Sequence, residues 1–382
     1  MKMRFLLPLL VCLTASSAAL ADLPLLFISA FAPGEKGAIH SFKFDPTNGS
    51  LEEIARNTEV SNPFFLAVSK DNRFLYATYS KQFGGKENEH ISSYALEGRS
   101  GKLRSLNQES SHGRATCYVT VDATGHSVLA ANYSSGTVAS LFASEDGTLH
   151  SATSVFQHEV DPLPAAADTS KQKPKQPNAH CIVVSPDNRF ALSADLGADK
   201  IFIYKLDAAT ARLTPNEAQR EAKLPAGAGP RHLIFNKAGN RVYVINELNN
   251  TVSFFRYDPD TGVLTLNQTI STLPDDFAGK SFCADLKLGA DETFLYGTNR
   301  GHDSVVIFRV GADGALLREG IEPSLGKGPQ NLLVTPEGKW LLCANMAGDN
   351  VAVFSIDPSS GKLKSAGTPT PMPRPSCIRM VP

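Results

Sequence analysis

The chain has 382 residues and a nearly balanced charge, with 37 basic and 38 acidic residues and a formal net charge of −1. Because neither sign dominates, no long-range field favours nucleic acid or an anionic membrane, and neither is expected as a partner. Length alone would allow two or three domains, but a repeated pattern along the chain predicts one closed domain instead.

The N-terminus has the pattern of an export signal. Two basic residues precede an apolar run over residues 5–13, which is too short to span a bilayer. Ala19-Leu20-Ala21 then supplies the small residues of a cleavage site. We therefore expect a signal peptide over residues 1–21 and a mature domain over residues 22–382 that is periplasmic or secreted.

One pattern recurs through the mature chain. An apolar strand ends in a polar turn such as Ser185-Pro186-Asp187-Asn188-Arg189, two further strands follow, and a tail of the Asp-Pro-x-x-Gly-x-Leu kind completes the unit. The period is roughly 50 residues, within the range of blade-type repeats. The strands are rich in Val, Ile, Phe, Leu and Tyr, and no long helical periodicity separates them. The pattern predicts an all-β propeller with four-stranded antiparallel blades.

Six complete copies are present, and a seventh is divided between the two ends of the chain. The complete copies begin near Asn62, Arg114, Pro177, Gly229, Ser281 and Gly328. The C-terminal segment 374–380 resembles the opening strand 229–235, but no blade follows it. The N-terminal segments 24–28 and 39–44 lack an opening strand. Joining the two ends gives a seven-bladed ring and pairs the edges that an open ring would expose.

Two segments break the repeat. Residues 81–89 lengthen a turn in the first complete copy, and residues 161–176, which contain several Pro, Ala and Lys residues, separate the next two copies. Insertions in a blade array tend to emerge on one face, often the binding face. An ordinary mobile surface loop is the alternative.

Five cysteines remain after the expected cleavage, and most lie inside apolar strands. They are Cys117, Cys181, Cys283, Cys343 and Cys377. An odd number cannot pair completely, and a free thiol in such a strand behaves as a small buried hydrophobe. We expect free thiols, although an oxidising compartment would permit one bridge. No CxxC pair or zinc cluster is present, and the Asp residues lie in ordinary turns, so neither a cofactor nor an obligatory metal is expected.

Residues at equivalent positions of the blades should converge on the ring axis, because each blade repeats the same geometry. Near the start of the first strand the copies place Cys117, His180, Arg231, Ala284 and Gln330. Just after the second strand they place Tyr79, Tyr133, Asp195, Glu247, Arg300 and Met346. The polar members of both sets fall in consecutive copies. We therefore expect His180, Arg231, Glu247 and Arg300 at one mouth of the channel, with Asp195, His232, Asp285 and His302 close by.

Each of the four central candidates also has a structural explanation. His180 could cap a strand, although the near-neutral pKa of imidazole suits acid–base catalysis. Arg231 could pair with an acid of a neighbouring blade, although its planar fork also fits a carboxylate or phosphate. Glu247 interrupts an apolar strand end and needs a cationic partner, so a purely structural ion pair is an open alternative. Arg300 lies in a turn whose Gly and Asp residues have conformational reasons to be there.

Motifs of several enzyme classes are absent from the sequence. It contains no GxSxG elbow, no P-loop, no HExxH and no dinucleotide fingerprint. Serine hydrolase, nucleotide-binding and zinc-protease functions therefore have no support.

Four segments occur in order at blade spacing. They are Pro177-Asn178-Ala179-His180, Gly229-Pro230-Arg231-His232, Asn246-Glu247-Leu248 and Asn299-Arg300-Gly301-His302-Asp303-Ser304. This set resembles the seven-bladed 6-phosphogluconolactonase family, which is related to the fungal 3-carboxy-cis,cis-muconate lactonizing enzymes. The resemblance covers the whole mature chain and implies an active-site cleft lined by His180, Arg231, Glu247 and Arg300. Two features depart from the family: many relatives carry a further histidine where Asn178 stands, and the typical enzyme is cytoplasmic and uses a phosphorylated lactone.

These observations predict a metal-independent lactonase. Its expected partner is a small anionic lactone, either of the 6-phosphogluconolactone type or an unphosphorylated aldonolactone. Glu247 or His180 would activate water while the other relays the proton, and Arg231 and Arg300 would stabilise the oxyanion and hold a carboxylate or phosphate. The alternatives are a non-catalytic exported propeller that binds or scaffolds, and a muconate-type enzyme that forms a lactone. We expect a monomer or a weak dimer.

Overall fold

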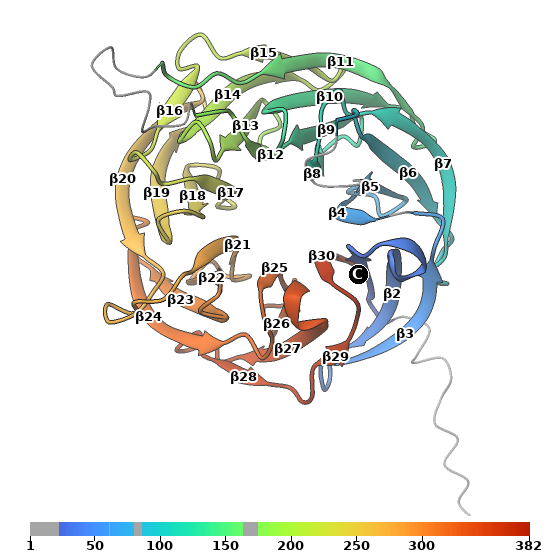
Figure 1. The fold of residues 1–382 in the computed structure, drawn as a ribbon, viewed down its shortest axis with the longest axis vertical. Coiled ribbons are helices and arrows are strands. Elements are labelled where there is room, and N and C mark those ends of the chain that lie inside the picture. Colours follow the sequence, from blue (N-terminus) through green and yellow to red (C-terminus); the bar gives the residue numbers. More distant parts are fainter. Residues whose placement is uncertain (1–22, 61, 80–85, 163–174) are drawn as a thin grey trace, which may run out of the picture.

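The protein folds into a ring of seven β-sheets (Figure 1). The computed structural model describes residues 23–60, 62–79, 86–162 and 175–382. The expected signal peptide therefore lies outside the described residues, as does most of each expected insertion. No helix among the described residues is long and apolar enough to cross a membrane.

The six complete blades are antiparallel sheets whose strands run in chain order from the centre of the ring outward (Figure 1). The first three comprise β4 (Pro63–Val68), β5 (Phe74–Tyr79), β6 (His90–Leu96) and β7 (Leu103–Ser110); β8 (Thr116–Val121), β9 (Ser127–Asn132), β10 (Thr137–Ala143) and β11 (Leu149–Gln157); and β12 (Ala179–Val184), β13 (Phe190–Asp195), β14 (Lys200–Asp207), β15 (Arg212–Pro215) and β16 (Glu221–Lys223). In the third of these, β15 and β16 both pair with β14 and divide the outermost position between them.

The next three blades have the same order. They comprise β17 (Pro230–Phe235), β18 (Arg241–Asn246), β19 (Thr251–Asp258) and β20 (Val263–Ser271); β21 (Phe282–Leu288), β22 (Phe294–Arg300), β23 (Ser304–Val310) and β24 (Leu316–Pro323); and β25 (Pro329–Val334), β26 (Trp340–Asn345), β27 (Asn350–Ile356), β28 (Leu363–Ser365) and β29 (Thr370–Pro371). Two short 3₁₀ helices, η1 (Gly34–Lys36) and η2 (Met346–Gly348), lie between strands.

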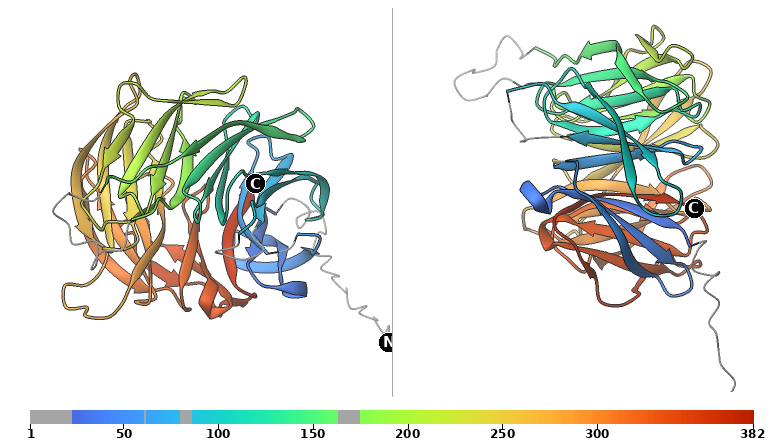
Figure 2. Two further views of the ribbon diagram at one scale, coloured as in Figure 1. Left: turned by 45° about the horizontal axis from the view of Figure 1, so that its top comes forward. Right: turned by 90° about the vertical axis from the view of Figure 1, so that its right-hand side faces the viewer.

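The seventh blade joins the two ends of the described chain, which confirms the closure expected from the sequence. Its strand order is β3 (Ser50–Asn57), β2 (Ala38–Asp45), β1 (Leu25–Ala30) and β30 (Pro375–Val381). The innermost strand β30 pairs antiparallel with β1, and Ile378 lies opposite Ile28. It also contacts the innermost strands β25 and β4 of its two neighbours, so the ring has no open edge (Figure 1). Figure 2 shows the stacked blades from two further directions.

The polar turn between the first two strands of a blade closes through local hydrogen bonds. In the first complete blade the Ser69 amide donates to the Phe74 carbonyl at 2.9 Å, and the Ser69 hydroxyl lies 2.6 Å from an Asp71 oxygen. Asn72 and its counterpart Asn188 take left-handed backbone angles, with φ of 58° and 63°. Asn tolerates this conformation better than most residues, which explains its place in the repeat.

The glycine of the repeated tail packs one blade against the next. A Cβ atom on Gly262 would lie 2.6 Å from the ring of Phe190 in the preceding blade, and one on Gly49 would lie 2.8 Å from Trp340. Both glycines also have positive φ, at 73° and 80°. Only a residue without a side chain allows the turn to approach the ring so closely. The tail glycine and the aromatic residue at the start of the second strand therefore recur as a pair.

The five cysteines of the described chain are free and buried, as the sequence predicts. Burial raises the pKa of the Cys181 and Cys283 thiols to about 12. These thiols are therefore protonated core side chains with little nucleophilic character.

Candidate active site

A repeated irregularity of the innermost strands sets the direction of two candidate side chains. The pairing of β12 with β13 skips His180, and the pairing of β17 with β18 skips Arg231. Comparable register shifts occur in the innermost strand of each blade. A bulge of this kind leaves one residue outside the ladder and re-aims its side chain. His180 and Arg231 thus hold equivalent positions, as the repeat predicts.

Arg231, Glu247 and Arg300 meet at one carboxylate oxygen. Glu247 Oε2 lies 3.0 Å from Arg231 Nε and 2.9 Å from Arg300 Nη2. The three side chains come from two adjacent blades. Arg231 is 2% exposed, Glu247 is 17% exposed and Arg300 is 25% exposed. Two cations around one partly buried carboxylate compensate for the loss of its hydration.

Further contacts fix each guanidinium. Arg231 Nη1 donates to the carbonyl of Ala284 and lies 3.1 Å from His232 Nε2. Arg300 Nη2 also donates to the carbonyl of Cys283 at 3.0 Å. Burial and the neighbouring Arg300 guanidinium lower the pKa of Arg231, against the opposing effect of Glu247.

His180 lies beside this group as a buried imidazole. Its ring is 5.4 Å from the ring of Tyr133 and 5.4 Å from that of His232, in edge-to-face geometry in both cases. Its Nδ1 lies 3.8 Å from Cys117 Sγ. Burial and then the charge of Arg231 hold the pKa of His180 well below its usual value. The imidazole is therefore neutral near pH 7 and retains a nitrogen lone pair.

His232 and Asp285 occupy the layer beneath. They are 3% and 1% exposed, and His232 Nδ1 lies 2.8 Å from Asp285 Oδ1. Both residues are thus linked to Arg231 and lie close to the central group, as expected from the sequence.

Asp195 does not belong to the group, because the expected register is wrong by one residue in its blade. The Leu196 amide bonds the Asn178 carbonyl, just as the Glu247 amide bonds the Gly229 carbonyl, so Leu196 is the equivalent of Glu247. The Asp195 carboxylate instead accepts from the Asn178 amide at 2.7 Å and lies 2.8 Å from a nitrogen of the buried His158. A shift of one residue along a strand turns the side chain to the other face.

His302 also has other partners. Its Nδ1 lies 2.7 Å from the Ser304 hydroxyl, and its ring meets the edge of Phe277 at 4.7 Å. Among the described residues, no hydrogen bond or ion pair joins it to Arg231, Glu247 or Arg300.

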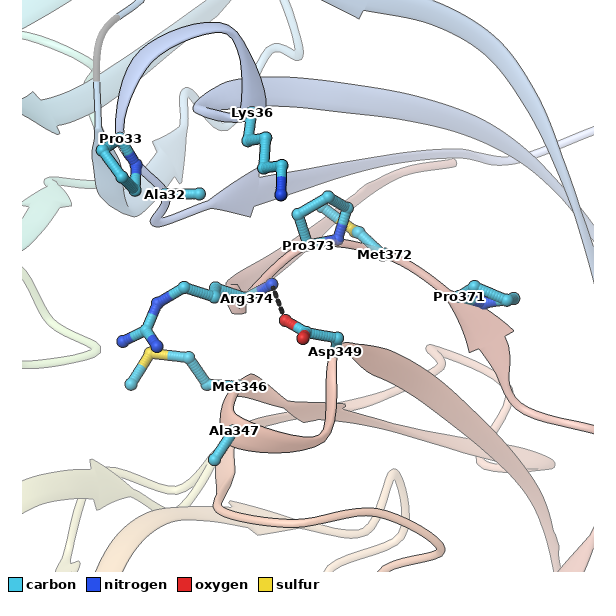
Figure 3. Close-up of a pocket in the computed structure, with 10 residues that line it drawn as sticks. All are labelled: Ala32, Pro33, Lys36, Met346, Ala347, Asp349, Pro371, Met372, Pro373 and Arg374. Atoms are coloured by element: carbon cyan, nitrogen blue, oxygen red, sulfur yellow. Dashed lines mark hydrogen bonds between the residues drawn. The ribbon is translucent and has the colours of Figure 1, made fainter.

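A pocket of about 520 Å³ lies on the same face of the ring, between η2 and the seventh blade (Figure 3). Met346 in this pocket holds the position that Glu247 holds in its own blade, since its amide bonds the Gly328 carbonyl. Lys36 and Arg374 add two cationic groups, and Asp349 accepts from the Arg374 amide at 2.9 Å. The remaining lining residues are Ala32, Pro33, Ala347, Pro371, Met372 and Pro373.

This pocket was not predicted from the sequence. Arg374 could have been found from the register, because segment 374–380 aligns with 229–235 and places Arg374 level with Gly229. Lys36 lies in η1, a segment without a counterpart in the repeat, and carries no such signal.

The fold and the site define a seven-bladed propeller with a charged group on one side of its channel mouth. Residues 25–380 match the family described as "Lactonase, 7-bladed beta-propeller", and the chain belongs to this family. It is 30% identical to the 6-phosphogluconolactonase of Bacillus subtilis over 93% of this chain and 97% of that protein. It is 26% identical to a 6-phosphogluconolactonase of Formosa agariphila, over 89% and 94% of the two chains. The structure of a periplasmic gluconolactonase of Pseudomonas aeruginosa superimposes with a TM-score of 0.85 at 31% identity, covering 94% of this chain and 99% of that one.

Proposed function

We propose that the protein is a lactonase that hydrolyses a sugar-acid lactone to the free acid without a metal ion. The names of its relatives, 6-phosphogluconolactonase and periplasmic gluconolactonase, support lactone hydrolysis as the reaction class. The observation that carries the proposal for this chain is the arrangement of Arg231 and Arg300 around one oxygen of Glu247, beside the neutral His180.

His180 is the better candidate for the general base. Glu247 Oε2 is already engaged by two guanidinium groups, whereas the neutral imidazole of His180 keeps a lone pair for a proton. In the proposed reaction His180 takes a proton from water as the water oxygen bonds to the lactone carbonyl carbon. The imidazolium then returns that proton to the ring oxygen as its bond to the carbonyl carbon breaks. The product is the open hydroxy acid.

Arg231 and Arg300 supply the positive charge that the intermediate requires. Arg231 Nη2 has no bonding partner among the described residues, so it remains available to an oxyanion. A preorganised donor of this kind typically contributes about a hundredfold or more in rate. Glu247 holds the two guanidiniums at a fixed separation, and Arg300, as the more exposed of the two, suits a carboxylate or phosphate of the substrate.

A non-catalytic binding propeller is the second candidate, and one observation favours it. Arg231 is only 2% exposed and is bonded on several sides, as in a structural ion network. Lactone formation by addition, as in the muconate-type relatives, is the third.

Export is part of the proposal. The Pseudomonas aeruginosa relative is named periplasmic, and residues 1–21 have the pattern of a signal peptide. Expression of the full chain in a Gram-negative host, followed by N-terminal sequencing of the periplasmic fraction, should give a chain that starts at Asp22. Full-length protein retained in the cytoplasm would contradict export.

The reaction can be tested by pH-stat titration of residues 22–382 with glucono-δ-lactone and its 6-phosphate, before and after dialysis against a chelator. We expect acid release above the spontaneous rate, no effect of the chelator, and a loss of at least about a hundredfold in kcat for Arg231→Ala. Arg309→Ala is the matched control, because Arg309 is a half-exposed arginine paired with Glu319 away from the mouth.

Three outcomes would overturn the proposal in different ways. Equal rates with and without protein would leave the binding propeller. Activity that is lost on chelation and restored by a divalent ion would remove metal independence. Acid uptake with an unsaturated dicarboxylic acid, but not with either lactone, would favour the lactone-forming reaction.

A further inference from the structure

The residues that follow the skipped positions occupy equivalent places on the seven innermost strands and form a layer beside the candidate site. They are Phe65, Tyr118, Cys181, His232, Asp285, Asn331 and Cys377. The rings of Phe65 and Tyr118 stack at 4.2 Å, and Tyr118 meets the edge of His232 at 5.1 Å. Asp285 then accepts from Asn331 Nδ2 at 2.6 Å. His232 and Asp285 are both buried within this layer.

The two ring nitrogens of His232 have partners that determine its protonation. Nε2 faces Arg231 Nη1 at 3.1 Å, and a guanidinium can only donate, so Nε2 must accept. The proton of the neutral ring therefore lies on Nδ1 and is donated to Asp285 Oδ1 at 2.8 Å. Burial and the Arg231 charge lower the pKa of His232 to about 3, which agrees with a neutral ring.

Asp285 is surrounded by donors only. Besides His232, it accepts from Lys287 Nζ at 2.8 Å, from Asn331 Nδ2 at 2.6 Å and from the Leu332 amide at 2.9 Å. Burial alone would raise the pKa of this carboxyl, but Lys287 and His232 hold it well below its usual range. The carboxylate is thus a fixed, ionised acceptor that leaves His232 one tautomer and one ring orientation.

We propose that Asp285 and His232 are positioning residues that fix the orientation of the Arg231 guanidinium at the channel mouth. His232 Nε2 and the Ala284 carbonyl hold Nη1, and the Glu247 carboxylate lies 3.0 Å from Nε as an ion pair, so Nη2 is the terminal nitrogen left for the reacting group. The role of Arg231 in catalysis rests on the proposed function. The Nδ1–H tautomer of His232 and its dependence on Asp285 do not.

Two variants of similar volume separate positioning from packing. In His232→Gln the side-chain amide can place its oxygen near the former Nε2 and still accept from Arg231, whereas His232→Leu fills the space without an acceptor. We expect His232→Gln to keep kcat within about tenfold of the wild type. His232→Leu should lose about a hundredfold in kcat, the usual cost of a misplaced catalytic group, with KM nearly unchanged and without a lower Tm than the Gln variant.

Nuclear magnetic resonance of the histidine side chains provides a readout that does not depend on activity. With ¹⁵N-labelled histidine, the signals absent from His232→Gln identify His232. We expect Nδ1 protonated and Nε2 unprotonated from pH 7 down to about pH 5. In Asp285→Asn the amide group must turn one N–H toward a donor, so the His232 signals should change tautomer or broaden.

The outcomes distinguish the two proposals. An Nε2–H tautomer in the wild type, or equal activity of the Leu and Gln variants, would overturn the positioning role. A wild type with the expected tautomer but without turnover of any lactone would overturn the proposed function and leave the positioning of Arg231 intact.

Discussion

The channel mouth has a charged side and an aromatic side, built on the same backbone positions. At the end of the second strand, the blades of β18 and β22 carry Glu247 and Arg300, whereas the blade of β9 carries Tyr133, whose amide bonds the Ala115 carbonyl. Tyr79 lies one residue earlier than the register predicts, because it pairs with Pro63 as Asn246 pairs with Pro230. In the seventh blade the equivalent residue is Phe31, whose amide bonds the Arg374 carbonyl as the Glu247 amide bonds that of Gly229. The ring thus supplies equivalent positions, and a few substitutions in consecutive blades supply the chemistry.

The largest expected effect is on kcat. It is seen by comparing substitutions of the residue that the strand pairing skips on each side of the ring. His180→Gln removes the candidate base but keeps most of its volume, and should lower kcat by about 10²- to 10⁴-fold, the usual contribution of a general base. Ser376→Ala is the matched control, because Ser376 is the residue skipped by the bulge of β30 on the other side of the ring. Among the described residues its hydroxyl bonds Ser29 and the Phe64 carbonyl, so kcat should stay within about threefold. A comparable loss in both variants, with equal loss of Tm, would assign His180 to packing.

The charged side was predictable from the sequence because a repeat converts sequence position into spatial position. His180, Arg231, Glu247 and Arg300 stand at matching places in three successive copies, and ring closure then requires them to converge. The sharing of Glu247 Oε2 by both arginines could not be predicted, because it depends on side-chain rotamers at the ends of separate strands.

The errors also have physical causes. The predicted register places Asp195 one residue away from its true equivalent. Because successive side chains of a strand point to opposite faces, its carboxylate contacts His158 instead. The His302 imidazole forms a hydrogen bond with the Ser304 hydroxyl of its own turn. Lys36 lies outside the repeat, where equivalence between blades gives no information.

The second prediction concerns pH and the charged surroundings of His180. Arg231, His232 and Arg300 face this imidazole, and burial acts with them to lower its pKa. A base works in its unprotonated form, so the acid limb of kcat/KM should lie below pH 6.5, and activity should persist at pH 6. In Arg231→Met one positive charge is gone, and the limb should move to higher pH in the remaining activity. If the acid limb of Arg231→Met stays at the wild-type pH, protonation of His180 is not the cause of the pH dependence.

The smallest expected effect is on stability and depends on the neutral His232. Its pKa of about 3 in the folded state lies below the unfolded value of 6.5, so unfolding takes up a proton once the pH falls below 6.5. The contribution of His232 to the free energy of unfolding should therefore be fully present above pH 6.5 and decline as the pH falls toward 3.

The variant His232→Gln removes this proton uptake. Between pH 6 and 4.5 its free energy of unfolding should fall less steeply than that of the wild type, by about 1.4 kcal/mol per pH unit. Urea titrations at half-unit pH steps measure the slope, and Tyr79→Phe, at the end of β5, should keep the wild-type slope. Parallel slopes for the wild type and His232→Gln would mean that His232 is protonated in the folded protein, which would contradict its role as an acceptor for Arg231.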